Sequence, residues 1–70
     1  MSVQVFVNGE QRELRSGATV ADVIELLPGA PEGRGVAVAV DGEVVRRSAW
    51  SGTKLATGAR VEVVVAVQGG

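Results

Sequence analysis

The chain has 70 residues, a formal net charge of −1 at pH 7, seven lysines and arginines against eight aspartates and glutamates, and neither cysteine nor histidine. Charges of both signs are interspersed along the chain, which argues against a nucleic-acid binder. The absence of cysteine and histidine excludes a disulfide, a Cys/His metal site, a thiolate nucleophile and a histidine base. We therefore do not expect an autonomous enzyme, and hydrophobic packing must stabilise a small core from a chain that is 46% apolar.

The first predicted element is a β-hairpin. The segment Val3–Val7 has valine at every second position, the period of a half-buried strand. Asn8-Gly9 follows and suits a two-residue type I′ turn, because both positions accept positive φ angles. Gln11–Leu14 is then the return strand, and a two-residue turn places Val3 opposite Leu14.

A short helix is predicted next. Thr19 stands three residues before Asp22, a spacing that resembles a capping box at a helix N-terminus. Pro28 disfavours helical backbone at the preceding residue and, with Gly29, ends an element of about two turns. One apolar stripe follows the helical spacing: Val20, Val23, Ile24 and Leu27.

A second hairpin follows a loop. Val36–Val40 is entirely apolar, which predicts a strand covered on both faces or nearly so. Asp41-Gly42 suits another tight turn, and Glu43–Val45 is the short return strand.

The last part of the chain combines an irregular stretch with a long strand. Arg46–Lys54 has no clear period, and Trp50 is its large anchor, which we expect in the core rather than in an interface. Thr57-Gly58 then turns the chain into a final strand over Arg60–Val67, in which valines alternate between the two faces.

These elements predict an α+β domain: a mixed sheet of four to five strands packed on one short helix. An apolar final strand that runs almost to the end of the sequence is typical of the β-grasp (ubiquitin-like) arrangement, in which the first and last strands lie parallel at the centre of the sheet. We expect residues 1–67 to form a single domain and residues 68–70 to form a flexible tail.

The terminal Gly69-Gly70 carries the strongest chemical signal. Glycines lack a Cβ atom, so a glycine tail can thread a narrow channel in a partner protein. A carboxylate on Gly70 could attack the α-phosphate of ATP, and a sulfur donor could then displace AMP to leave a thiocarboxylate. Such a carrier needs neither histidine nor cysteine of its own. Taken alone, the pair of glycines is also compatible with a frayed terminus that has no role.

Sequence features along nearly the whole chain resemble one family. They are Val7–Glu10, Thr19-Val20, Gly35–Val45, Arg47–Trp50, Leu55, Gly58, Arg60–Val63 and Ala66–Gly70. This pattern resembles the ThiS family, the sulfur carriers of thiamine biosynthesis. Arg46, Ala59 and Asp41 depart from residues common in the family; all three lie in expected turns, so we expect local effects only.

The resemblance implies a β-grasp fold and a cycle with partner enzymes. A ThiF-like adenylating enzyme would use ATP to activate the carboxylate of Gly70, and a persulfide donor would supply sulfur for the thiocarboxylate. A ThiG-like thiazole synthase would then take that sulfur. Gln68, Gly69 and Gly70 would be the tail inserted into partner active sites. No cofactor or metal would be bound by the carrier itself.

A docking surface is expected beside the tail. Phe6 falls on the sheet face opposite the helix, and with Val64 and Ala66 on the neighbouring strand it could form an exposed apolar patch for a partner. The alternative is that a loop covers Phe6.

No apolar stretch of the sequence approaches the roughly 20 residues that cross a bilayer, and the N-terminus is too polar for a signal peptide. We therefore expect the protein to be located in the cytoplasm.

Three other functions remain open at this point. A carrier of the same chemistry could serve molybdopterin or cysteine synthesis, although the compact chain and its Ala66–Gly70 ending favour thiamine. The chain could instead be a ubiquitin-like modifier that is joined to lysines through Gly70. It could also be a binding-only module, in which case the two terminal glycines would be dispensable.

Overall fold

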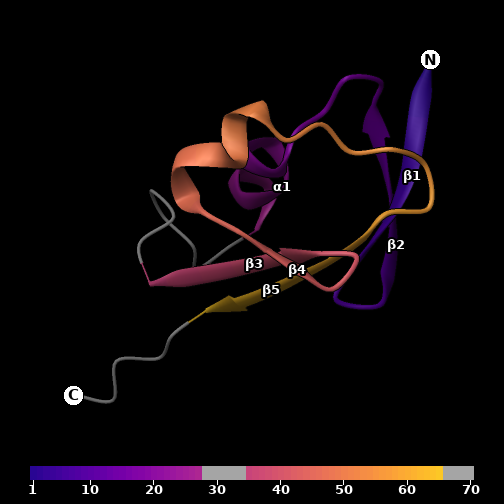
Figure 1. Ribbon diagram of the computed structural model, residues 1–70. Coiled ribbons are helices and arrows are strands. Elements are labelled where there is room, and N and C mark those ends of the chain that lie inside the picture. Colours follow the sequence, from indigo (N-terminus) through magenta and orange to yellow (C-terminus); the bar gives the residue numbers. More distant parts are fainter. Residues whose placement is uncertain (28–34, 66–70) are drawn as a thin grey trace.

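The structure, a computed structural model, describes residues 1–27 and 35–65. These residues form one five-stranded sheet with an α-helix and a 3₁₀ helix on the same side of it (Figure 1). In the described part of the chain, no helix is both long and apolar enough to cross a membrane. The elements in chain order are β1 (Ser2–Val7), β2 (Glu10–Arg15), α1 (Val20–Leu26), β3 (Val36–Val40), β4 (Glu43–Val45), the 3₁₀ helix η2 (Arg47–Gly52) and β5 (Arg60–Val65).

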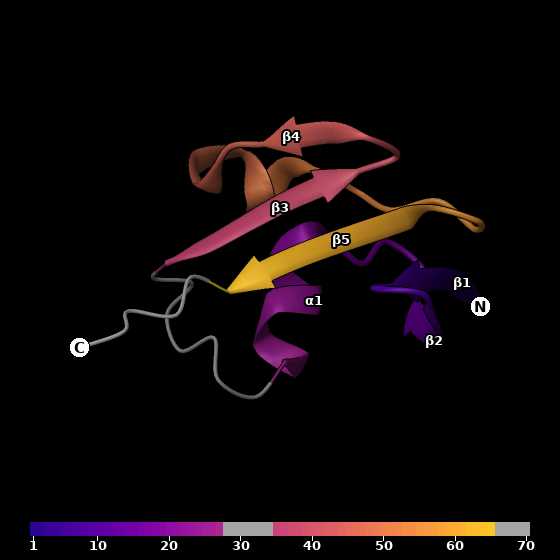
Figure 2. The ribbon, with the colours of Figure 1, turned by 90° about the horizontal axis from the view of Figure 1, so that it is seen from below.

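The sheet order is β2-β1-β5-β3-β4. The first and last strands are parallel neighbours near its centre, and every other pair is antiparallel. Figure 2 shows β4, β3 and β5 side by side, with α1 on the far side of the sheet. The predicted mixed sheet packed on one short helix is thus confirmed.

The first hairpin has the predicted register. Val3 lies opposite Leu14, and the turn residues Asn8 and Gly9 have φ angles of 50° and 84°. Both values lie in the left-handed region that a type I′ turn requires. The return strand β2 is one residue longer at each end than the prediction.

Helix α1 begins with the predicted capping box. The Thr19 hydroxyl accepts from the Asp22 N–H at 3.4 Å, and the Asp22 carboxylate accepts from the Thr19 N–H at 2.8 Å. Each bond satisfies an N–H group near the helix start. Leu27 has an extended backbone (φ −93°, ψ 123°), as expected for a residue that precedes proline.

Replacing Thr19 by alanine should lower the free energy of unfolding by about 1 kcal/mol, because alanine cannot accept the N-cap hydrogen bond. Urea denaturation followed by circular dichroism measures this difference. The matched variant Thr19→Ser keeps the hydroxyl and should remain close to wild type. An equal loss in both variants would contradict a capping role and point to the threonine methyl group.

The hydrophobic core lies between the sheet and the helices. Trp50 is only 6% exposed, which confirms that it belongs to the core, and its Nε1–H donates to the Val45 carbonyl at 2.9 Å. The segment around it was expected to be irregular but forms η2, a local structure whose i to i+3 bonds leave no clear apolar period. The buried residues are Val5, Val7, Leu14, Ala18, Val20, Val23, Ile24, Val38, Trp50, Leu55, Ala59, Val61 and Val63.

Strand β3 is not covered on both faces, so that prediction is wrong for the described residues. Val38 is 2% exposed and faces the helices, whereas Ala37 is exposed and Ala39 half-buried on the other face. The reason is that α1 and η2 pack on one side of the sheet (Figure 1). Small alanines alternating with valines fit a strand with one covered face.

Candidate functional site

Strand β5 is the element that leads to the predicted functional tail. It lies between β1 and β3, ends at Val65 and continues into residues 66–70. Gln68, Gly69 and Gly70, and also Ala66 of the predicted docking face, lie outside the described residues. The structure therefore defines the body that presents this segment.

The core and β3 anchor β5 along its length. Val61 and Val63 are 1% and 7% exposed and face the helices. Along one edge, the backbone of β5 pairs with β3 in five successive register positions, from Val61–Val40 to Val65–Val36. Buried side chains and the pairing of Val61–Val65 with β3 together hold β5 in the sheet.

Two turn residues also hold β5 through their side chains. Asn8 donates from Nδ2 to the Val63 carbonyl at 3.1 Å and accepts at Oδ1 from the Val63 N–H at 2.8 Å. Asp41, in the β3–β4 turn, accepts at Oδ1 from the Arg60 N–H at 3.0 Å, and its own N–H donates to the Arg60 carbonyl at 2.8 Å. The local sequence pattern predicts Asn8 and Asp41 only as turn formers and gives no indication of these bonds.

The outer face of the sheet, the face opposite α1, carries exposed apolar side chains. Val64 is 64% exposed and Val44 80% exposed. Register places Ala37 opposite Val64 on this face, and Ala39 opposite Val44. We call these four residues the outer apolar patch: Ala37, Ala39, Val44 and Val64. It lies over β5, β3 and β4, with Val64 one residue from the end of β5.

Phe6 lies at the other end of β5 from Val64. It is 39% exposed on the outer face, and its register partner on β5 is Arg60. Arg60 and Val64 are four residues apart, which corresponds to about 13 Å along a strand. The structure thus places both predicted docking residues on the outer face but does not bring them together.

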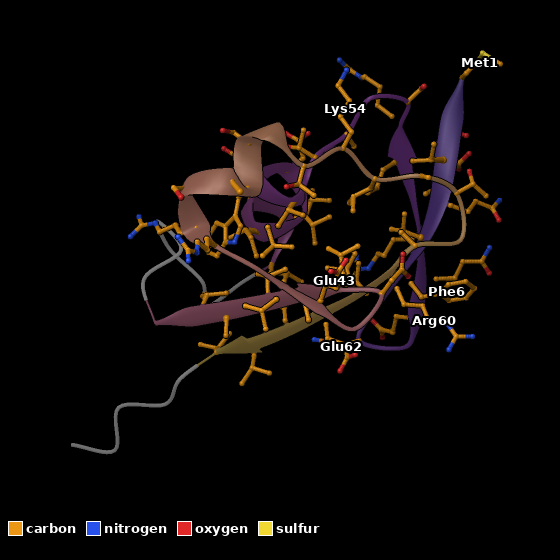
Figure 3. All side chains as sticks on the ribbon, viewed as in Figure 1. Met1, Phe6, Glu43, Lys54, Arg60 and Glu62 are labelled. Atoms are coloured by element: carbon orange, nitrogen blue, oxygen red, sulfur yellow. The ribbon has the colours of Figure 1, made fainter. Side chains whose placement is uncertain are left out.

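Charged residues separate Phe6 from the outer apolar patch. Arg60 and Glu62 are exposed on β5, and both point away from the helix layer (Figure 3). An open hollow of about 450 Å³ lies beside them, lined by Phe6, Asn8, Gly9, Arg60, Val61 and Glu62. This end of the outer face therefore combines an aromatic ring with both signs of charge, which suits a polar rim around an apolar contact.

Within residues 1–27 and 35–65, no group of three or more acidic, histidine or cysteine residues is placed to hold a metal ion. The described surface instead offers an apolar patch beside the strand that leads to the C-terminal segment. Such a surface can bind a partner while the segment beyond β5 enters that partner.

Comparison with known proteins identifies the fold and the family of this chain. The crystal structure of the thiamine biosynthesis protein (ThiS) from Geobacter metallireducens is similar to this chain, with a TM-score of 0.76, 27% sequence identity, and coverage of 97% of this chain and 100% of that one. The predicted β-grasp fold is thereby confirmed. No curated protein matches the chain significantly. The ThiS family model matches residues 5–70, which is all but the first four residues, and the chain therefore belongs to the ThiS family.

Proposed function

We propose that this protein is a sulfur carrier of thiamine biosynthesis that carries sulfur as a thiocarboxylate on Gly70. The observation that carries the proposal is the family match, which runs through the core, the last strand and the terminal Gly69-Gly70. The similar structure, a thiamine biosynthesis protein, supports the choice of pathway.

The proposed chemistry takes place on the carboxylate of Gly70. A carboxylate oxygen attacks the α-phosphorus of ATP, pyrophosphate leaves, and an acyl adenylate forms. The terminal sulfur of a persulfide donor then attacks the carbonyl carbon and displaces AMP. A thiol cleaves the resulting sulfur–sulfur bond, which leaves the thiocarboxylate on Gly70 and a disulfide on the donor side.

Partner enzymes supply the catalytic groups in this proposal. The chain contains no histidine or cysteine, so an adenylating enzyme of the ThiF type provides the ATP site, and the carrier acts as its protein substrate. A ThiG-like thiazole synthase consumes the sulfur. Gln68 and Gly69 enter each active site with Gly70, because two glycines without Cβ atoms fit where larger residues would clash.

The outer apolar patch is the proposed docking surface for these enzymes. Val64 contributes an exposed branched side chain beside the start of the tail. Its register partner Ala37 has only a methyl group, so a partner enzyme can approach the sheet closely there. Phe6 and Arg60 form the far end of the contact. Burying Val64 against a partner would stabilise the complex by about 1–2 kcal/mol.

Intact-mass spectrometry tests the proposal directly. After incubation of the full chain with ATP, a ThiF-type enzyme and a persulfide donor, the mass should rise by the difference between a sulfur and an oxygen atom, and the C-terminal peptide should carry the change. No change, with an enzyme proven active on another carrier, would contradict the proposal. Isopeptide adducts on lysines of other proteins would instead identify a ubiquitin-like modifier.

A further inference from the structure

The Asn8 side chain forms hydrogen bonds that the β1–β2 turn does not require. Its φ angle of 50° and the φ angle of 84° at Gly9 are sufficient for a type I′ connection between β1 and β2. The carboxamide additionally forms two hydrogen bonds to the backbone of Val63, a residue 55 positions away in the sequence. Both bonds are partly buried, which protects them from competition with water.

These two bonds extend the pairing of β1 with β5. The backbone register of this pair covers Phe6–Arg60 and Val7–Val61, and the Asn8 N–H still donates to the Val61 carbonyl at 2.9 Å. In a strand, alternate residues direct their backbone N–H and C=O groups to the same side, so Val63 is next on that side. The Asn8 carboxamide offers one donor and one acceptor there, as a peptide group would.

The position of Val63 gives these bonds their significance. Val63 is two residues before Val65, the last described residue of β5, and seven residues before Gly70. At Val63, β5 is held on one edge by β3 and on the other by Asn8. Without the carboxamide, the last residues of β5 would be held on one edge only and could pivot away from β1.

We propose that Asn8 is a positioning residue for the Gly70 carboxylate: by pairing with Val63 it fixes the direction in which the chain leaves the sheet. The inference rests on the function proposed above, since it concerns delivery of Gly70 to the adenylating enzyme. Docking on the outer face fixes the body of the carrier, and the direction of β5 then decides how often the carboxylate reaches the α-phosphate of ATP.

Asp41 provides a matched control at the opposite end of β5. It also has a positive φ angle, 49°, in a two-residue turn, and its side chain also bonds a backbone N–H of β5. Its partner, however, is Arg60, the first residue of the strand. Loss of the Asp41 side chain should therefore weaken the fold without changing the direction in which β5 ends.

The test compares Asn8→Gly with Asp41→Gly in the full chain. Glycine accepts the positive φ of both turns, so each variant removes a side-chain clamp while the turn is retained. With a ThiF-type enzyme and ATP, Asn8→Gly should lower the kcat for adenylation about tenfold and leave KM nearly unchanged, because misplaced reacting atoms slow the step within the complex. Asp41→Gly should retain the wild-type kcat.

Amide hydrogen exchange provides a second readout that does not depend on activity. The Val63 N–H should exchange faster in Asn8→Gly than in wild type or Asp41→Gly. Faster exchange with an unchanged kcat would overturn the positioning role, as would an equal fall in kcat for both variants. A wild-type chain that the active enzyme does not adenylate would overturn the proposed function itself.

Discussion

A chain that lacks Gly69 and Gly70 should not gain sulfur under conditions in which the full chain is converted completely. The reason is geometric as well as chemical. Two residues of fully extended chain span about 7 Å, so without them the new carboxylate on Gln68 would stop short of the ATP site even when the carrier is docked normally. The new terminal residue also carries a Cβ atom, which a channel built for glycine would not accept. Intact-mass spectrometry measures the loss.

The truncated chain should still fold and dock. Every residue in the described hydrophobic core lies between Val5 and Val63, so we expect an unfolding transition in urea close to that of wild type. The truncated chain should also compete with wild type for the adenylating enzyme through the outer apolar patch. Sulfur gain by the truncated chain would contradict the role of Gly70, and failure to compete would contradict docking through the described face.

Several parts of the fold could be predicted from the sequence because local patterns determine them. Asn8-Gly9 fixes a two-residue turn, and the turn fixes the register that places Val3 opposite Leu14. Thr19 and Asp22 mark the start of α1 three residues apart, and both predicted capping bonds are present. In each case the interacting residues are near one another in the chain.

Other features depend on long-range pairing and could not be predicted in this way. Asn8 reaches Val63 because β1 ends beside Val61, two residues before Val63 on β5, and no local pattern gives the parallel register. The same register separates Phe6 from Val64, two residues that are predicted to share one apolar patch. The roles proposed for the terminal residues rest on composition and family resemblance, because these residues lie outside the part of the chain that the structure describes.

Replacing Val64 by either lysine or glutamate should raise the KM for adenylation roughly tenfold or more, because a charge in the centre of an apolar interface must lose its water without gaining a partner. Val64 is 64% exposed in the carrier alone, so either substitution should change the free energy of unfolding by less than about 1 kcal/mol. Initial rates at several carrier concentrations, followed by intact mass, separate KM from kcat. Opposite effects of the two charges would indicate an electrostatic contact instead of an apolar one.

Leu26 supplies the matched control for this experiment. It is another exposed apolar side chain, 56% accessible, but it belongs to α1 on the opposite layer from the outer apolar patch. Leu26→Lys and Leu26→Glu introduce the same charges at a similar exposure, and both should retain the wild-type KM. If they weaken adenylation as much as the Val64 variants do, docking does not depend on the outer face, and the partner surface must include the helix side. If only the Val64 variants fail, the exposed end of β5 both presents the tail and binds the enzyme that receives it.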